Sequence, residues 1–179
     1  YKCLKQIDLI LSCGDLPAEY LTYLVTVFNV PLFYIRGNHD TSFEINPPQG
    51  CVDIHGKIVV YNGIRIMGWQ GSHWYNGKQL QYTEGQMKKM IFIAKLKIWW
   101  NRGVDLIISH APPKDIHDGK DPCHKGFKCF KDLIFDYSPN YFLHGHIHTS
   151  FKNREARKTR INNTDVVNTF GYYVFNYKL

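Results

Sequence analysis

The segment LFYIRGNHD (residues 32–40) is an apolar run that ends in a cluster of polar side chains. Such a run predicts a short strand buried on both faces, as in a parallel sheet. A similar run, residues 7–12, comes earlier and ends at Cys13-Gly14-Asp15. Between them, residues 18–29 are helical in composition, and Pro31 closes that helix because proline cannot continue it. The sequence therefore predicts a strand–helix–strand unit of an α/β fold.

Further strand and helix signals follow this unit. Residues 57–61 and 64–67 flank Asn62-Gly63, the dipeptide preferred in two-residue hairpin turns, and predict an antiparallel hairpin. Thr83-Glu84-Gly85-Gln86 has the form of a capping box, and the apolar spacing after it predicts a helix to about Arg102. The middle of the chain thus adds an antiparallel pair and a long helix to the parallel unit.

The second half of the chain predicts more strands and no second domain. Residues 104–108 and 141–143 are short apolar runs, and the tail, residues 166–178, alternates like paired strands. The sequence contains no internal repeat, so we expect residues 1–179 to form a single α/β domain. No apolar run approaches the roughly 20 residues that a membrane span needs.

Composition and charge narrow the class of protein. Hydrophobic residues make up 44% of the 179 residues, which excludes a disordered polyelectrolyte. The five cysteines are odd in number, irregularly spaced and without a C-x-x-C pair, so a reducing cytoplasmic location is expected rather than a disulfide framework. The 22 Lys and Arg against 15 Asp and Glu give a charge of +7, which indicates an anionic partner.

Four predicted strands end in polar clusters: Gly14-Asp15, Gly37-Asn38-His39-Asp40, Ser109-His110 and Gly145-His146-Ile147-His148. In parallel α/β sheets, ligands bind beyond the carboxyl ends of the strands, so we expect these clusters to meet. Asp, Asn and His supply oxygen and imidazole ligands that suit Mn, Fe, Zn or Co, and the clusters contain no sulfur ligand. His146 and His148 would point to the same side if the chain there is extended.

These motifs, in this order and strand context, resemble the signature of the calcineurin-like metallophosphoesterases. The resemblance implies a four-layer α/β/β/α sandwich that binds two divalent metal ions, with Mn expected first and Fe, Zn, Co or Ni as alternatives. It implies hydrolysis of phosphoesters, with diesters favoured over monoesters as substrates. The attacking group would be a hydroxide that the two ions activate for in-line attack on phosphorus.

The resemblance also implies roles for individual residues. Asp15 would bridge the two ions, Asn38, His110 and His146 would complete the shell of one ion, and His148 would bind the other. His39 would contact the substrate phosphate or protonate the leaving group, and Asp40 would orient the His39 ring.

One departure from the family pattern concerns its first motif, D-x-H, which nothing before Cys13 supplies. Asp53-Ile54-His55-Gly56 matches that motif in letters, but it follows Pro47-Pro48-Gln49-Gly50 rather than an apolar strand, and we interpret it as a decoy. We expect the natural protein to begin about one strand and a loop upstream, so that the domain here lacks its first strand.

Several alternatives remain open at this point. The long polar segment 111–127 is either a lining of the substrate pocket or a solvated loop. The basic residues between Lys152 and Arg160 either meet a polyanion or lie on a solvated hairpin. The expected partner is accordingly a small phosphoester or nucleotide-like substrate. The alternatives are a nuclease that acts on DNA or RNA and a catalytically silent scaffold that binds proteins. The sequence does not indicate an oligomeric state.

Overall fold

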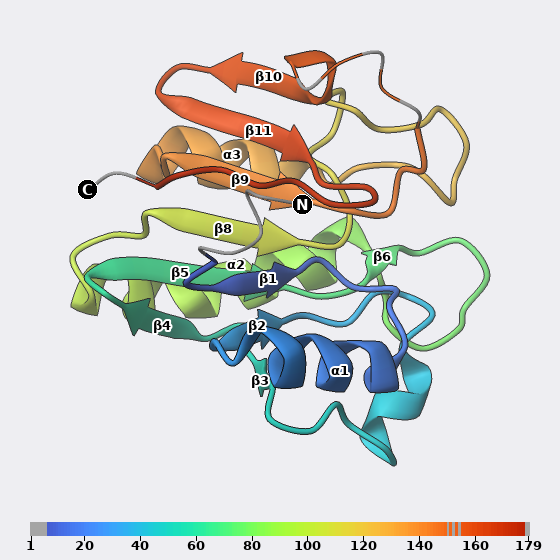
Figure 1. The fold of residues 1–179 in the computed structure, drawn as a ribbon. Coiled ribbons are helices and arrows are strands. Elements are labelled where there is room, and N and C mark those ends of the chain that lie inside the picture. Colours follow the sequence, from blue (N-terminus) through green and yellow to red (C-terminus); the bar gives the residue numbers. More distant parts are fainter. Residues whose placement is uncertain (1–6, 150, 152, 154, 178–179) are drawn as a thin grey trace.

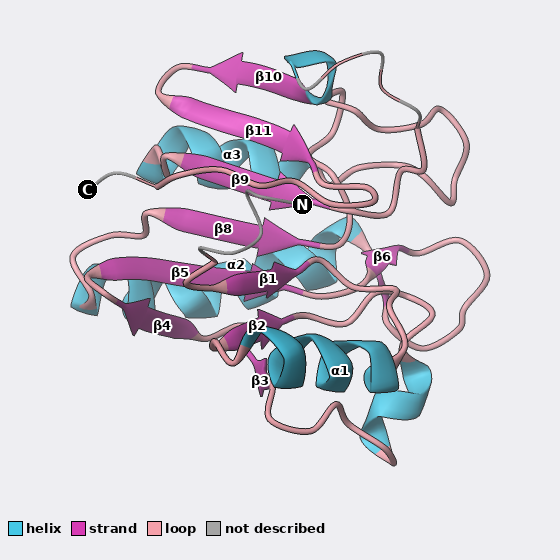
Figure 2. Ribbon diagram, viewed as in Figure 1, coloured by secondary structure: helices cyan, strands magenta, loops and turns pink. Residues whose placement is uncertain are grey.

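Two sheets packed face to face, with helices on their outer faces, form the fold in the computed structural model (Figures 1 and 2). The structure describes residues 7–149, 151, 153 and 155–177. The smaller sheet has the order β1-β2-β3, formed by Ile10–Ser12, Leu32–Tyr34 and Val52–Asp53. Its strands are all parallel, and helix α1 (Ala18–Phe28) connects the first two. The predicted strand–helix–strand unit is therefore confirmed.

The larger sheet has six strands in the order β10-β11-β9-β8-β5-β4. Its four inner strands run parallel, and the edge strands β4 and β10 run antiparallel to their neighbours. The strands are β4 (Ile58–Tyr61), β5 (Ile64–Trp69), β8 (Leu106–Ser109), β9 (Tyr141–His144), β10 (Lys158–Ile161) and β11 (Thr164–Asn168). A separate parallel pair, β6 (Ser72–His73) and β7 (Gln81–Tyr82), lies beyond β5 in the chain.

Neighbouring residues of the inner strands face opposite layers. Ile66, Leu143 and Val167 pack toward the smaller sheet, in a cluster that also contains Ile35 of the chain after β2. The residues next to them, Met67, Phe142 and Val166, pack toward helices α2 (Glu84–Trp100) and α3 (Lys128–Tyr137). Alternation of side chains along each strand thus gives the larger sheet two buried faces. The expected α/β class with sheets covered by helices is confirmed.

The local signals for the hairpin and for α2 are also confirmed. Asn62 and Gly63 both have positive φ (47° and 82°), as a two-residue turn between β4 and β5 requires. The Thr83 hydroxyl accepts the Gln86 N–H at 3.2 Å, and the Gln86 side chain accepts the Thr83 N–H at 2.8 Å. This capping box begins α2, which buries Met87, Ile91, Ala94 and Ile98.

Two parts of the chain differ from the sequence prediction. Helix α3 lies in a stretch for which no helix was predicted. The tail forms a strand only as far as Asn168, because the aromatic residues after it pack against the cluster between the sheets instead of pairing with another strand. Lys178 of the predicted paired strands lies outside the described residues. No helix in the described part of the chain is long and apolar enough to cross a membrane.

Candidate metal centre

The carboxyl ends of four strands converge on one edge of the fold. Strands β1 and β2 run parallel in one sheet, β8 and β9 run parallel in the other, and all four point toward the same end (Figure 1). Backbone bonds join the loops that follow: the Gly145 N–H donates to the His110 carbonyl at 3.1 Å. The His110 ring reaches the other sheet, where its Nδ1 lies 2.8 Å from the Cys13 carbonyl oxygen. The predicted clusters therefore meet in space.

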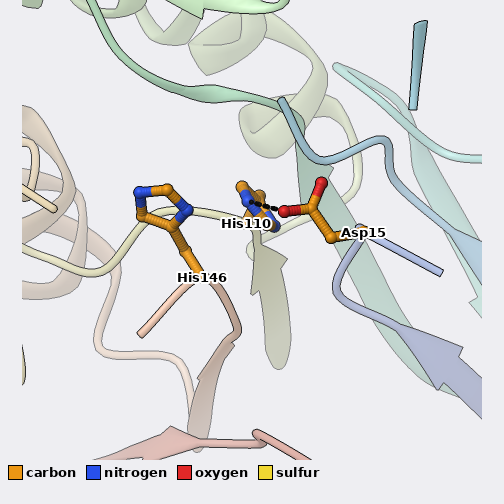
Figure 3. Close-up of side chains that lie close together, drawn as sticks. All are labelled: Asp15, His110 and His146. Carbon is orange, nitrogen blue, oxygen red and sulfur yellow. Dashed lines mark ion pairs between the residues drawn. The ribbon is translucent and has the colours of Figure 1, made fainter. Parts of the chain in front are cut away.

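At this edge, Asp15, His110 and His146 offer ligand atoms that all lie within 4.8 Å of one another. Figure 3 shows His110 between the other two side chains, with its ion pair to Asp15. The His110 Nε2 atom lies 3.2 Å from Asp15 Oδ2 and 3.0 Å from Asn38 Oδ1. Four of the predicted ligands are thus neighbours, and Asn38, His110 and His146 are buried.

The hydrogen bonds of His110 show that these residues fit a cation. A carbonyl oxygen can only accept, so the Cys13 carbonyl fixes the proton of a neutral His110 ring on Nδ1. The lone pair of Nε2 then faces two acceptor oxygens, those of Asp15 and Asn38. The Asn38 amide nitrogen donates to the Tyr75 hydroxyl at 3.3 Å. Acceptor atoms this close to one another require either a proton or a positive ion between them, and this N and O donor set suits a divalent metal.

The charge states of the neighbouring ligands match this interpretation. Burial raises the pKa of Asp15, but positive charge at the His110 position and the His39 N–H outweigh it and lower the pKa to about 2. Burial and the nearby His110 lower the pKa of His146 to about 4. At neutral pH the carboxylate is therefore ionised and the His146 imidazole is neutral, which are the forms that bind metal. His146 Nε2 donates to the Cys123 carbonyl at 2.8 Å, which leaves Nδ1 as its metal-binding atom.

Close approach between the loops that follow β1 and β2 explains the glycines in their motifs. Gly14 has φ = +87°, and a Cβ there would lie 2.3 Å from the Gly37 nitrogen. A Cβ on Gly37 would lie 2.0 Å from Asp15 Oδ1. Asp15 and His146 themselves have positive φ, 58° and 63°, which non-glycine residues rarely adopt. The loops thus hold both ligands in strained backbone conformations.

The two residues next to Asn38 differ in their surroundings. His39 is exposed, and its N–H donates to Asp15 Oδ1 at 2.9 Å. The buried Asp40 carboxylate accepts the N–H groups of Asp15 and Gly37, each at 2.7 Å. Among the described residues it forms no hydrogen bond with the His39 ring. Asp40 thus ties the two metal-site loops together through their backbones, and its role toward His39 stays a prediction.

His148 does not join the metal cluster in the described part of the structure. Its exposed ring stacks on Phe170 with centroids 4.6 Å apart. The positive φ of His146 is the reason, because it breaks the extended conformation that would aim both rings to one side.

The decoy motif, Asp53-Ile54-His55-Gly56, also lies apart from the metal cluster. Asp53 ends the short strand β3, contrary to our expectation, and His55 accepts the Gln70 N–H at 3.2 Å away from the cluster.

The segment between β8 and α3 supplies side chains whose role the sequence left open. His117 bridges the buried His144 (2.9 Å) and the Thr159 hydroxyl (2.8 Å), which anchors this segment beside β9. The His124 ring lies against His146 with centroids 5.3 Å apart. The only sequence signal for this segment was the density of Asp and His in residues 111–127. That signal did not distinguish a pocket lining from a solvated loop. The structure places this segment against the metal cluster.

The fold and the site define an α/β protein with an Asp, Asn and His cluster for a divalent cation. A family model for the calcineurin-like phosphoesterases matches residues 1–150, and the chain belongs to that family. The crystal structure of TT1561 of Thermus thermophilus has a similar fold, with a TM-score of 0.60 and 14% sequence identity. That match covers 94% of this chain and 83% of that chain. No curated protein matches the chain.

Proposed function

We propose that this chain hydrolyses phosphoesters, preferentially diesters, with two divalent metal ions, Mn first among them. The observation that carries the proposal is the cluster of Asp15, His110 and His146, with the Asn38 amide oxygen 3.0 Å from His110 Nε2. When bound, the ions would supply the Lewis acidity that activates water and neutralises the charge on phosphoryl oxygens. Membership of the calcineurin-like phosphoesterase family supports the same reaction class.

The chain's own residues divide the work of binding and proton transfer. Asp15 has one carboxylate oxygen near His110 and the other bonded to the His39 N–H, and we assign it to both ions. Asn38, His110 and His146 would hold one of these ions. His148 could serve the other only after its ring leaves Phe170. His39 lies at the exposed rim and is the residue we assign to the substrate phosphate or the leaving-group oxygen.

Hydrolysis of bis(p-nitrophenyl) phosphate with and without Mn²⁺ tests this function. Asp15→Asn should abolish the Mn²⁺-dependent rate, because the carboxylate charge that would hold the ions is lost. Asp136→Asn is the matched control, since Asp136 lies on the surface of α3 in an exposed pair with Lys95. Activity without added metal after chelation, or equal rates in the two variants, would contradict the proposal. Mn²⁺ binding without turnover of either ester class would favour the scaffold alternative.

The role of His39 needs substrates that differ in their leaving groups. His39→Ala should retain Mn²⁺ binding and lose about 10²–10⁴-fold in rate on esters with poor leaving groups. The loss should be much smaller with p-nitrophenolate, which departs without a proton. Equal losses on both kinds of substrate would assign His39 to phosphate binding alone.

The basic residues near the C-terminus give little support to a nuclease. Lys158 and Arg160 both pair with the Asp165 carboxylate, at 2.8 Å and 2.6 Å. The Arg157 guanidinium lies over the Phe151 ring, 4.8 Å from its centroid. Lys152 and Arg154 lie outside the described residues. We therefore propose a small phosphodiester or nucleotide-like substrate, and steep salt dependence of DNA or RNA binding would instead favour the nuclease.

A further inference from the structure

A second group of possible metal ligands lies beside the first. Asp121, Cys123 and His124, in the segment between β8 and α3, offer one oxygen, one sulfur and one nitrogen atom, all within 4.8 Å of one another. The His124 ring packs against His146 of the first cluster, with centroids 5.3 Å apart. The two groups share no residue.

The backbone of this turn holds the three side chains together. Asp121 Oδ1 accepts the N–H groups of Cys123 and His124, each at 3.1 Å. The Gly119 N–H donates to the His124 carbonyl at 2.8 Å and closes the turn on its other side. The second Asp121 oxygen is free of backbone bonds and lies 3.0 Å from His124 Nδ1. The Asp121 carboxylate and the His124 ring are therefore positioned before any ion binds, which lowers the cost of forming a site.

The spacing of the donors suits a small divalent ion. Two donor atoms 3.0 Å apart subtend an angle of about 90° at an ion about 2.1 Å from each, within the range of distorted tetrahedral sites. A donor set of carboxylate, thiolate and imidazole is that of zinc rather than of the harder Mn²⁺. The first cluster, by contrast, contains only oxygen and nitrogen donors.

We propose that Asp121, Cys123 and His124 form a zinc-binding site, separate from the Asp15 cluster and adjacent to it. The three side chains leave a fourth position open, and the Asp121 and His124 side chains are about half exposed, so an ion can enter from solvent. An ion there adds positive charge beside His146, at the rim where an anionic substrate arrives. The zinc site does not depend on the proposed phosphoesterase activity.

Cobalt(II) titration of the full chain tests the site, because cobalt takes zinc positions and a bound thiolate gives a charge-transfer band in the near ultraviolet. We expect this band in the wild type, its loss in Cys123→Ser, and its retention in Cys51→Ser, a matched thiol removal at a second partly buried cysteine. Asp121→Asn should weaken cobalt binding at least about tenfold while the band persists at saturation. Zinc should displace cobalt and remove the band.

Two outcomes would overturn the proposal: no such band at saturating cobalt, or a band that survives in Cys123→Ser. Asp15→Asn separates this site from the phosphoesterase, because it removes the oxygen and nitrogen site and should leave the thiolate band in place. A phosphoesterase that fails its own test with the band intact would refute the proposed function alone. Circular dichroism and thermal melting confirm that each variant is folded.

Discussion

Gly37→Ala should remove metal from the Asp15 cluster without touching a ligand. A Cβ at Gly37 would lie 2.0 Å from Asp15 Oδ1 and 2.7 Å from the Asp15 nitrogen. Ordinary van der Waals contact begins near 3.4 Å, so the carboxylate must move by about 1.4 Å. Metal–oxygen bonds of about 2.0–2.2 Å tolerate only about ±0.2 Å. The variant therefore loses a carboxylate ligand, and we expect Mn²⁺ affinity to fall at least about 100-fold, or about 2.7 kcal/mol.

Gly85→Ala is the matched control for this change. Gly85 lies in the first turn of α2, and a Cβ there meets no atom within 4 Å. The substitution should leave Mn²⁺ affinity unchanged and stabilise the helix by up to about 1 kcal/mol. Isothermal titration calorimetry with Mn²⁺ measures the affinities, and urea denaturation in the presence of a chelator measures the stabilities. If Gly37→Ala binds Mn²⁺ as tightly as Gly85→Ala, the Asp15 carboxylate is not a ligand at this position.

Three further predictions concern stability. Burial lowers the pKa of His55 to about 4, so the unfolded chain binds more protons between pH 6.5 and 4, and the free energy of unfolding falls by roughly 2–3 kcal/mol over that range. His55→Asn keeps an acceptor for the Gln70 N–H and should remove this part of the pH dependence in urea denaturation. Hydrogen bonds from Arg65 lower the pKa of Asp105, so their contribution is full above pH 4 and is lost as the pH falls through the folded pKa. Asp105→Asn should cost about 2 kcal/mol at pH 7, and this cost should shrink as the pH falls through the folded pKa of Asp105. Glu84→Gln should cost about 1–2 kcal/mol in the same assay, because the Glu84 carboxylate accepts the first two N–H groups of α3; an unchanged midpoint would argue against that role.

The role of Glu84 also explains why α3 was not predicted. A helix is recognised in a sequence largely by a Ser, Thr, Asp or Asn at its N-cap, and α3 has Phe127 there with no side-chain cap. Its cap comes from Glu84, 44 residues earlier than Lys128. The hairpin at Asn62-Gly63 and the capping box at Thr83 were predicted because their signals are local. Sequence patterns cannot indicate a bond between two helices that pack only in the folded chain.

The tail shows a related limit of periodicity. Tyr173, Phe175 and Tyr177 alternate with other residues as in a strand, yet no ladder forms after Asn168 in the described residues. The rings of Phe175 and Tyr177 instead lie against Tyr141, with centroids 4.6 Å and 6.0 Å away. Alternation of apolar and polar residues indicates only that one side of an extended chain is buried. A partner strand is not needed when a layer of aromatic residues covers the open side of a sheet.

In the candidate site, too, some features follow from local sequence and others from contacts between distant segments. The convergence of Asp15, Asn38, His110 and His146 was predictable, because parallel strands bring the residues after them to one edge of the fold. The directions of the side chains were not, because Asp15 and His146 adopt positive φ and each turns its neighbours away from the extended pattern. The Asp40 carboxylate bonds the Asp15 N–H across the gap between β1 and β2, and His146 donates to Cys123 from another loop. The strained backbone at Asp15 and His146 persists only because such bonds from distant segments hold it. These bonds position the ligands for an ion, and local sequence patterns cannot encode them.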